Sequence, residues 1–192
     1  MIWHGSGLSD DFYWPYKLLI NGASGGVGTF AIQLAKLWGT EITAVCSAGK
    51  MDLVRKLGAG HVIDYTQQDF TQRGQQYDLI LDVQGHHSVS DYKHALKPNG
   101  RYVMVGGETH LANQVMWQGL RSALLGGPQM GLLLHKANKG LDELNQLLEK
   151  GEIEPVVDRC YPLCELQEAM RYYSEGSVRG KLVITIMLEG TS

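Results

Sequence analysis

The chain has 192 residues, of which 44% are hydrophobic, and this is enough for one domain with a well-buried core. A net charge of −3 without any basic run argues against nucleic acid and anionic membranes as partners, and no segment is long and apolar enough to span a bilayer. The first residues lack the apolar core of a signal peptide and the three cysteines are an odd number, so we expect a cytoplasmic protein.

A glycine-rich loop follows directly on the first predicted strand, which begins at residue 18. From Ala23 onward, the sequence Ala-Ser-Gly-Gly-Val-Gly fits the pattern G-x-G-x-x-G with alanine in the first glycine position. In that pattern Gly25 lets the backbone approach a pyrophosphate, and Gly28 lets the following helix pack closely on the strand. The free N–H groups at the start of that helix bind the anion. The predicted pyrophosphate-binding residues are Ala23, Ser24, Gly25, Gly26, Val27 and Gly28.

The residues after the loop complete a βαβ unit. Apolar residues at helical spacing predict a helix over 29–38, which ends at Gly39, and residues 41–46 read as a second strand. A dinucleotide-binding fingerprint requires this order of strand, glycine loop, helix and strand within about thirty residues.

Two other motifs overlap the same glycines. Residues 22–26 match G-x-S-x-G, the nucleophile elbow of α/β hydrolases with Ser24 as nucleophile, but strands should precede such an elbow and nothing marks a matching acid and histidine. The glycines also fit the loop of short-chain dehydrogenases, whose Tyr-x-x-x-Lys pair should follow the loop. The pair in this chain, Tyr13 and Lys17, precedes the loop and encloses a proline. We therefore favour the pyrophosphate interpretation.

The end of the second strand indicates which dinucleotide binds. An NAD-specific site normally has an acidic residue about twenty residues beyond the glycines, where it accepts hydrogen bonds from the ribose. The corresponding stretch, 45–50, has no acid and offers the hydroxyl of Ser47 and the ammonium of Lys50, which suit a 2′-phosphate. NADP(H) is therefore the predicted cofactor. The alternative is that Ser47 caps the next helix and Lys50 is a solvated surface charge.

Helices and strands continue to alternate after this unit. The predicted elements are a helix over 50–57, a strand over 61–64, a short helix over 66–73, a strand over 77–83, a helix over 88–96 and a strand over 101–105. The nearly unbroken apolar run at 78–81 suits a strand that is covered on both faces. We expect an α/β fold with a doubly wound, mainly parallel six-stranded sheet, the Rossmann fold, in a single domain.

In such a sheet the ligand binds beyond the carboxyl ends of the strands. After the fourth and fifth strands, the candidate residues at this edge are Val83, Gln84, Gly85, Val105, Gly106 and Gly107. The alternative for these glycines is a role as turn residues only.

The last third of the chain contains one segment that indicates an oligomer. The predicted elements are a strand within 124–135, a helix over 140–150, a strand over 155–160, a helix over 163–173 and a strand over 181–186. The Met- and Leu-rich stretch from Met130 to Leu134 would be an aggregation risk as a bare edge strand. Pairing with a second copy would cover it, so we expect a homodimer through this edge.

Neither the cysteines nor the histidines indicate a metal site. Cys160 and Cys164 lack the spacing of a zinc ribbon or a redox pair. His86 and His87 are neighbours whose side chains diverge, and no cluster of cysteines or carboxylates joins them. We interpret them as part of a polar loop.

Four ordered motifs carry a family resemblance. They are Asn-Gly-Ala-Ser-Gly-Gly-Val-Gly-Thr-Phe-Ala-Ile-Gln-Leu-Ala-Lys at 21–36, Leu-Val-Arg-Lys-Leu-Gly-Ala-Gly-His-Val-Ile-Asp-Tyr at 53–65, Leu-Asp-Val-Gln-Gly at 81–85 and Val-Arg-Gly-Lys-Leu-Val-Ile at 178–184. From residue 18 to the C-terminus the chain resembles the cofactor-binding domain of the medium-chain dehydrogenase/reductase superfamily, and it is most similar to the zinc-free quinone oxidoreductase branch.

The resemblance implies an oxidoreductase with NADPH as hydride donor and no zinc. It implies that Tyr65, after the third strand, joins Ser47 and Lys50 around the adenosine phosphate; the alternative for Tyr65 is an aromatic ring that packs on the sheet. It also implies that the residues after the fourth and fifth strands approach the nicotinamide. We predict no catalytic residue, because the nicotinamide delivers the hydride and the protein contributes position and electrostatics.

The chain departs from the family before the first strand. Relatives carry a catalytic domain there that shapes the substrate cleft, and we expect this chain to lack it. We expect a dinucleotide-binding domain over 18–188 and an atypical leader over 1–17, whose aromatic residues cover apolar surface. A truncated or rearranged chain of this kind is expected to bind NADP(H) but not to reduce substrate alone. The alternative is a non-catalytic module for dinucleotide sensing or oligomerisation.

Overall fold

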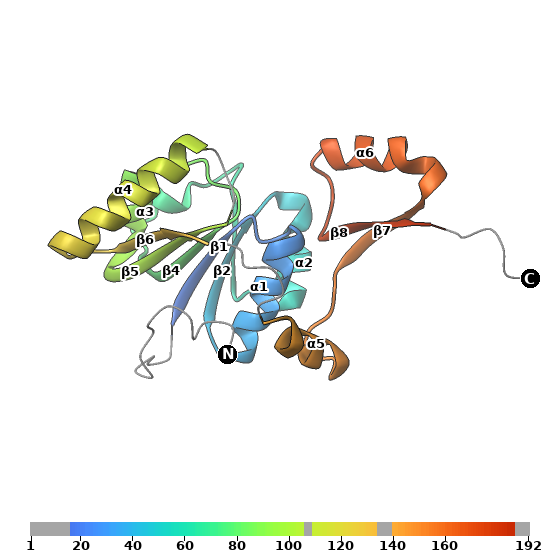
Figure 1. Cartoon of the computed structure of the whole chain (residues 1–192), viewed down its shortest axis with the longest axis horizontal. Helices are drawn as coiled ribbons and strands as arrows, with labels where there is room; N and C mark the ends of the chain where they lie inside the picture. Colours follow the sequence, from blue (N-terminus) through green and yellow to red (C-terminus); the bar gives the residue numbers. More distant parts are fainter. Residues whose placement is uncertain (1–15, 106–108, 134–139, 187–192) are drawn as a thin grey trace, which may run out of the picture.

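The computed structural model describes residues 16–105, 109–133 and 140–186. The main sheet has six parallel strands in the order β3-β2-β1-β4-β5-β6 (Figure 1). In sheet order the strands are β3 (His61–Asp64), β2 (Glu41–Cys46), β1 (Lys17–Asn21), β4 (Tyr77–Asp82), β5 (Leu96–Met104) and β6 (Gln129–Leu132). The chain runs outward from β1 to β3 and then crosses to β4, so the winding reverses between β1 and β4. The predicted doubly wound, six-stranded α/β sheet is confirmed.

Helices pack on both faces of this sheet. In chain order the helical segments up to the sixth strand are α1 (Gly26–Leu37), η1 (Ala48–Lys50), α2 (Met51–Leu57), η2 (Phe70–Gln72), α3 (Val89–Ala95) and α4 (Thr109–Leu125). One core cluster joins Ile32 of α1 and Val54 of α2 to Ile20 of β1. The other joins Tyr92 of α3 and residues of α4 to Leu19, which points to the opposite face of β1. Burial on both faces explains the continuous apolar runs of the central strands.

A second, two-stranded sheet follows the main sheet. The parallel strands β7 (Val157–Pro162) and β8 (Lys181–Thr185) are connected through η3 (Leu163–Glu165) and α6 (Leu166–Ser174), and α5 (Leu141–Glu149) precedes them. Figure 1 shows this β7–β8–α6 unit beside α1 and α2, on the other side from α3 and α4. Contacts at Gly180 and at Glu154 are among those that attach it to the main unit. Gly25 and Gly180 form an isolated β-bridge, and the Gln33 amide bonds the Glu154 backbone N–H and carbonyl, both at 2.9 Å.

Several predicted elements differ from the structure. The residues 109–125, for which no helix was predicted, form α4, and the strand predicted within 124–135 begins only at Gln129. The last two predicted strands, over 155–160 and 181–186, pair with each other in the separate two-stranded sheet. The short helix predicted over 66–73 is reduced to η2, and β5 begins at Leu96 because the polypeptide becomes extended directly after α3. Of the predicted leader, residues 1–15 lie outside the described residues, and Lys17 already belongs to β1.

Candidate dinucleotide site

The glycine loop joins β1 to α1 through a left-handed residue at Gly22, where φ is +81°. The N–H of Gly25 donates back to the Gly22 carbonyl oxygen at 3.2 Å, and Gly25 is the N-cap residue of α1. A Cβ built on Gly22 would lie 2.8 Å from Cγ of Gln84, in the loop after β4. The turn therefore needs a glycine at position 22, one residue before the predicted motif.

Gly28 is placed as the motif predicts. It is buried in the first turn of α1, and a Cβ built on it would lie 2.6 Å from Cα of Ala23. The helix can approach the end of the strand this closely only without a side chain. Ala23 is fully buried and its N–H donates to the Val45 carbonyl oxygen at 3.1 Å, so the fold accommodates its methyl group. Gly25 has more space, since a Cβ there would first meet the Gly22 carbonyl oxygen at 3.5 Å.

The N-terminus of α1 has the electrostatic character of an anion site. Its first turn contains no acidic residue, and Val27 at this end is 47% exposed. Ser24 is buried and its carbonyl oxygen accepts a hydrogen bond from the Gly180 N–H at 2.8 Å. The partial positive charge of the helix end is therefore not neutralised by an acid in the first turn, and it faces the carboxyl edge of the sheet.

Lys181 adds a cation at this helix N-terminus, although it was not among the residues predicted for the site. Its Nζ lies 3.1 Å from a Cβ built on Gly26 and 5.4 Å from the centre of the Phe30 ring. A cation beside a helix N-terminus opposes the helix dipole, so this placement becomes favourable when an anion lies between them. The signal in the sequence was the Val-Arg-Gly-Lys motif, but its place beside the loop depends on the bridge between Gly180 and Gly25.

The three residues predicted around the adenosine phosphate lie at the adjoining ends of β2 and β3. The N–H of Tyr65 donates to the Cys46 carbonyl oxygen at 3.2 Å, and the N–H of Lys50 donates to the Ser47 carbonyl oxygen at 3.0 Å. Ser47 precedes η1 but its side chain makes no capping hydrogen bond. Tyr65 is 63% exposed, which leaves its ring accessible to a ligand.

The ammonium of Lys50 has a main-chain partner. Its Nζ donates to the Gly176 carbonyl oxygen at 2.6 Å, in the turn after α6. Burial lowers the pKa of Lys50 and the charge of Arg179 lowers it further, while Cys46 and Asp158 act in the opposite direction. An ammonium has three donors, so the bond to Gly176 leaves others for a phosphate.

Val83 and Val105 lie at the same edge of the sheet, directly after β4 and β5. The N–H of Val83 donates to the Asn21 carbonyl oxygen at 3.0 Å, and the N–H of Val105 donates to the Asp82 carbonyl oxygen at 2.7 Å. These bonds continue the strand pairing one residue past the strands, so Val83 is held beside the end of β1 and Val105 beside the end of β4.

Gly85 lies in the loop after β4, where a Cβ built on it would be 2.7 Å from Cδ2 of Leu111. A side chain at this position would displace the end of the Leu111 side chain, so the glycine contributes to the packing of this loop against α4. Gly106 and Gly107 lie outside the described residues.

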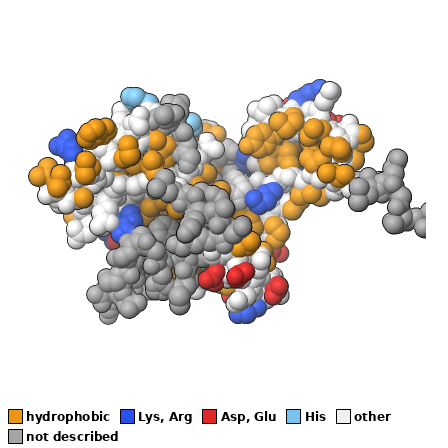
Figure 2. All heavy atoms as spheres, in the orientation of Figure 1, with side chains coloured by type: hydrophobic (Ala, Val, Ile, Leu, Met, Phe, Trp, Pro, Cys, Tyr) orange, Lys and Arg blue, Asp and Glu red, His pale blue; other side chains and the backbone are white. Residues whose placement is uncertain are grey.

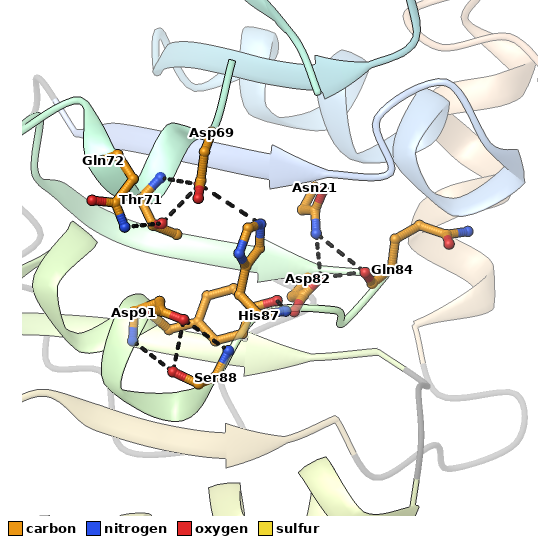
Figure 3. Close-up of polar contacts among 10 residues, drawn as sticks. Asn21, Asp69, Thr71, Gln72, Asp82, Gln84, His87, Ser88 and Asp91 are labelled. Carbon is orange, nitrogen blue, oxygen red and sulfur yellow. Dashed lines mark hydrogen bonds and ion pairs between the residues drawn. The ribbon is translucent and has the colours of Figure 1, made fainter. Parts of the chain in front are cut away.

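His87 packs within the polar loop that was predicted for it. Its Nε2 lies 3.8 Å from Oδ1 of Asp69 (Figure 3), and its ring meets the Phe70 ring edge-on at 4.9 Å between centres. Within the described ranges, no three His, Cys, Asp or Glu side chains are grouped to hold a metal ion, and the absence of zinc stays a prediction. Among the helices that the structure describes, none combines the length and hydropathy needed to cross a membrane.

Known proteins share both the sequence pattern and the sheet. A family model described as zinc-binding dehydrogenase matches residues 57–184. The chain is 34% identical over 200 residues to the mitochondrial NAD(P)H oxidoreductase RTN4IP1 of Mus musculus, and this alignment covers 94% of the chain and 50% of that protein. It is 32% identical over 185 residues to the chloroplastic quinone-oxidoreductase QR1 of Triphysaria versicolor, covering 93% of the chain and 55% of that protein.

A solved structure agrees with these relatives. The quinone oxidoreductase from Coxiella burnetii superposes with a TM-score of 0.74 at 29% identity, over 90% of this chain and 53% of that one. The chain thus spans about half the length of the curated relatives it matches. The dehydrogenase matches favour the pyrophosphate interpretation of the glycine loop over the nucleophile elbow. The chain belongs to the zinc-binding dehydrogenase family, in the quinone oxidoreductase-like branch of the medium-chain dehydrogenase/reductase superfamily.

Proposed function

We propose that this chain is the NADP(H)-binding domain of a quinone oxidoreductase-type enzyme. The observation that carries the proposal is the glycine loop at the N-terminus of α1, with Lys181 beside it and Lys50 at the neighbouring strand end. A helix N-terminus and two cations match the negative charges of a pyrophosphate and a 2′-phosphate. The relatives named NAD(P)H oxidoreductase and quinone oxidoreductase support the same cofactor class.

The proposed site has three parts along the carboxyl edge of the sheet. The pyrophosphate part consists of residues 23–28 and Lys181. The adenosine-phosphate part consists of Ser47, Lys50 and Tyr65. The nicotinamide part consists of Val83, Gly85 and Val105, with Gly106 and Gly107 from outside the described residues. The first two parts lie over β1, β2 and β3 and the third over β4 and β5, so a dinucleotide crosses the point where the winding of the sheet reverses.

Bound NADPH supplies a hydride to an electron-poor substrate of the quinone or enone class. The chain holds and orients the dinucleotide with backbone N–H groups and the two ammonium groups. NADPH is favoured over NADH because the end of β2 offers Ser47 and Lys50 in place of an acid. We assign no catalytic residue.

The chain alone is proposed not to reduce substrate. The β7–β8–α6 unit exposes a set of large apolar side chains (Figure 2). They are Val157, Leu163, Leu166, Met170, Tyr173 and Ile186. Apolar surface of this extent marks a face that another polypeptide covers. We propose that this polypeptide also supplies the wall of the substrate cleft. In the relative RTN4IP1, the half of the protein that this chain does not match could play that part.

A homodimer through β6 is part of the proposal. β6 is the last strand of the main sheet within the described residues, and Met130 in it is buried on one face. Exposed apolar residues of α4, namely Met116, Leu120 and Leu124, lie near this edge because α4 packs on β6. This surface also favours the second candidate function, a non-catalytic oligomerisation or dinucleotide-sensing module. Turnover would exclude this second function, whereas its absence in the chain alone is expected for both.

The first experiment is calorimetric titration of the full chain with NADPH and, separately, with NADH at one salt concentration. We expect NADPH to bind at least about tenfold more tightly, since charge-assisted bonds to the 2′-phosphate are lost with NADH. NADPH oxidation is then followed with quinones and enones. Binding without turnover supports a domain that needs a covering polypeptide or the sensing module, and binding of neither dinucleotide overturns the proposed function.

The cytoplasmic location stays a prediction from the first residues of the sequence and the cysteine count. The relatives RTN4IP1 and QR1 are named mitochondrial and chloroplastic, so cell fractionation is the measurement that decides the location.

A further inference from the structure

Asp82 is a fully buried carboxylate that the proposed site does not use. Its Oδ1 accepts from Nδ2 of Asn21 at 2.9 Å and from the N–H of Gln84 at 3.1 Å (Figure 3), and its Oδ2 accepts from the Tyr102 hydroxyl at 2.6 Å. In the part of the chain that the structure describes, no lysine, arginine or histidine forms an ion pair with it. Removing a carboxylate from water without a cation has a large cost, which neutral donors offset only when they are held in place.

The position of this carboxylate in the sheet is informative. Asp82 ends β4 and Asn21 ends β1, and the two are register partners in neighbouring strands. Their hydrogen bond therefore lies at the point where the winding of the sheet reverses, directly beneath the edge where a ligand binds an open α/β sheet. Tyr102 extends the connection to β5. Burial, and then the charge of Asp82, raises the pKa of the Tyr102 hydroxyl, which keeps it protonated as a donor.

The same contacts fix the loops that follow the strands. Asn21 precedes Gly22, and Asp82 precedes the loop that contains Gln84. Nδ2 of Asn21 also donates to the Gln84 carbonyl oxygen at 3.4 Å, so one amide holds both the strand end and the loop. The close approach of Gln84 to Gly22 described above leaves little room for either loop to shift. A change at Asp82 is therefore transmitted to the relative position of the glycine loop and the β4 loop.

We propose that Asp82 is a positioning residue that holds the loop after β4 against the glycine loop, in the arrangement that the nicotinamide half of the dinucleotide requires. The inference rests on the proposed function. Asp82 acts as a hydrogen-bond acceptor for Asn21, Gln84 and Tyr102, and it does not touch the ligand. The adenosine half lies over β2 and β3, whose ends the Asp82 contacts do not include, so it depends less on this carboxylate.

The test compares two ligands on four versions of the full chain. NADPH reports on both halves of the site, and 2′,5′-ADP reports on the adenosine half alone. The chains are the wild type, Asp82→Ala, Asp82→Asn and the matched control Asp78→Ala. Asp78 is a carboxylate of the same strand that accepts from the Lys17 N–H and from Lys97 at the opposite edge of the sheet. Thermal unfolding of each chain is measured alongside.

We expect Asp82→Ala to weaken NADPH binding by about tenfold or more and 2′,5′-ADP binding by less than about threefold, because three donors lose their acceptor beneath the nicotinamide half. Asp82→Asn keeps an acceptor oxygen for Asn21 and Gln84, and its amide can donate to the Tyr102 hydroxyl, so it should restore NADPH affinity. Asp78→Ala should leave the ratio of the two affinities unchanged even where it lowers the unfolding temperature.

The outcomes separate the inference from the proposed function. Equal weakening of both ligands by Asp82→Ala, or no weakening of either, overturns the positioning role. Failure of Asp82→Asn to restore NADPH binding also overturns it, since a positioned acceptor would then not be enough. A wild-type chain that binds neither ligand overturns the proposed function, and the role of Asp82 with it.

Discussion

The backbone N–H of Gly180 donates to the carbonyl oxygen of Ser24 at 2.8 Å, which ties the start of β8 to the glycine loop. Gly180 has φ of +79°, and a Cβ built on it would lie 2.8 Å from Cβ of Val156, so this approach requires glycine. The next residue along the chain is Lys181, and the bond therefore determines that an ammonium group stands beside the N-terminus of α1. A segment close to the C-terminal end of the described residues thus completes the site that the glycine loop begins.

The two lysines of the site should have separable effects. Lys181→Met removes the cation beside α1 and should weaken NADPH and NADH binding equally, by about tenfold, because both dinucleotides carry the pyrophosphate. Lys50→Met should weaken NADPH binding by a similar factor and leave NADH binding unchanged, since only NADPH carries a 2′-phosphate. Calorimetric titration measures both. The exposed Lys56→Met is the matched control, and a Lys50→Met chain that loses NADH affinity equally contradicts the assignment of Lys50 to the 2′-phosphate.

Gly28→Ala tests the close contact of α1 with the end of β1. The added methyl group would lie 2.6 Å from Cα of Ala23, and the backbone must move to admit it. We expect a loss of about 1–3 kcal/mol in the free energy of unfolding, as for other overpacked sites, and weaker NADPH binding because the helix N-terminus shifts. Urea unfolding measures the first effect. Gly60→Ala is the control, because a Cβ there meets only the Ile42 carbonyl oxygen at 3.9 Å and should change stability little.

The sequence predicted those parts of the fold that depend on local pattern. The strands at 41–46 and 61–64 were predicted with the bounds that the structure has, because each is a short apolar run between turn residues. The helix α4 was missed. It contains Gly119, which lowers the helical signal, and a Cβ there would collide with the Met130 carbonyl group of β6. The glycine is thus explained by a contact that the sequence does not display.

The candidate site also contains some residues that local sequence pattern predicts and others that it does not. The residues 23–28, Ser47 and Lys50 could be named from the sequence because they follow strands whose ends share one edge. Lys181 and Asp82 could not, because their roles depend on long-range contacts. Lys181 reaches the loop only through the pairing of Gly180 with Gly25, and Asp82 is distinguished by burial and by its bonds to neighbouring strands.

The raised pKa of Tyr16 leads us to expect a loss of stability at alkaline pH. Its hydroxyl donates to the Asp78 carbonyl oxygen at 3.4 Å, and burial, with a further contribution from the charge of Asp78, raises the pKa of Tyr16 to about 12. A tyrosine in the unfolded chain ionises near pH 10, so the unfolded state releases the proton first. The contribution of Tyr16 to the free energy of unfolding is therefore complete below about pH 10 and is lost as the pH rises to 12.

Urea unfolding at pH 8, 10 and 11 measures this dependence. Tyr16→Phe has no proton to release, so its stability should fall less steeply than that of the wild type over this range. The difference between the two chains cancels the titration of the lysines, which both share. Parallel losses in the two chains would show that Tyr16 is not responsible.

Leu132→Pro tests the proposed dimer at the edge of the main sheet. The N–H of Leu133 donates to the Met104 carbonyl oxygen of β5 at 2.8 Å, and successive N–H groups of a strand point in opposite directions, so the N–H of Leu132 points away from β5. Proline at 132 removes this outward donor and leaves the pairing with β5 intact, as edge strands tolerate. We expect a dimer for the wild type and for Leu132→Ala, which keeps the N–H, and a monomer for Leu132→Pro. Sedimentation velocity at micromolar concentration measures all three, and a dimer that survives the proline must be formed by a surface other than the main-chain edge of β6.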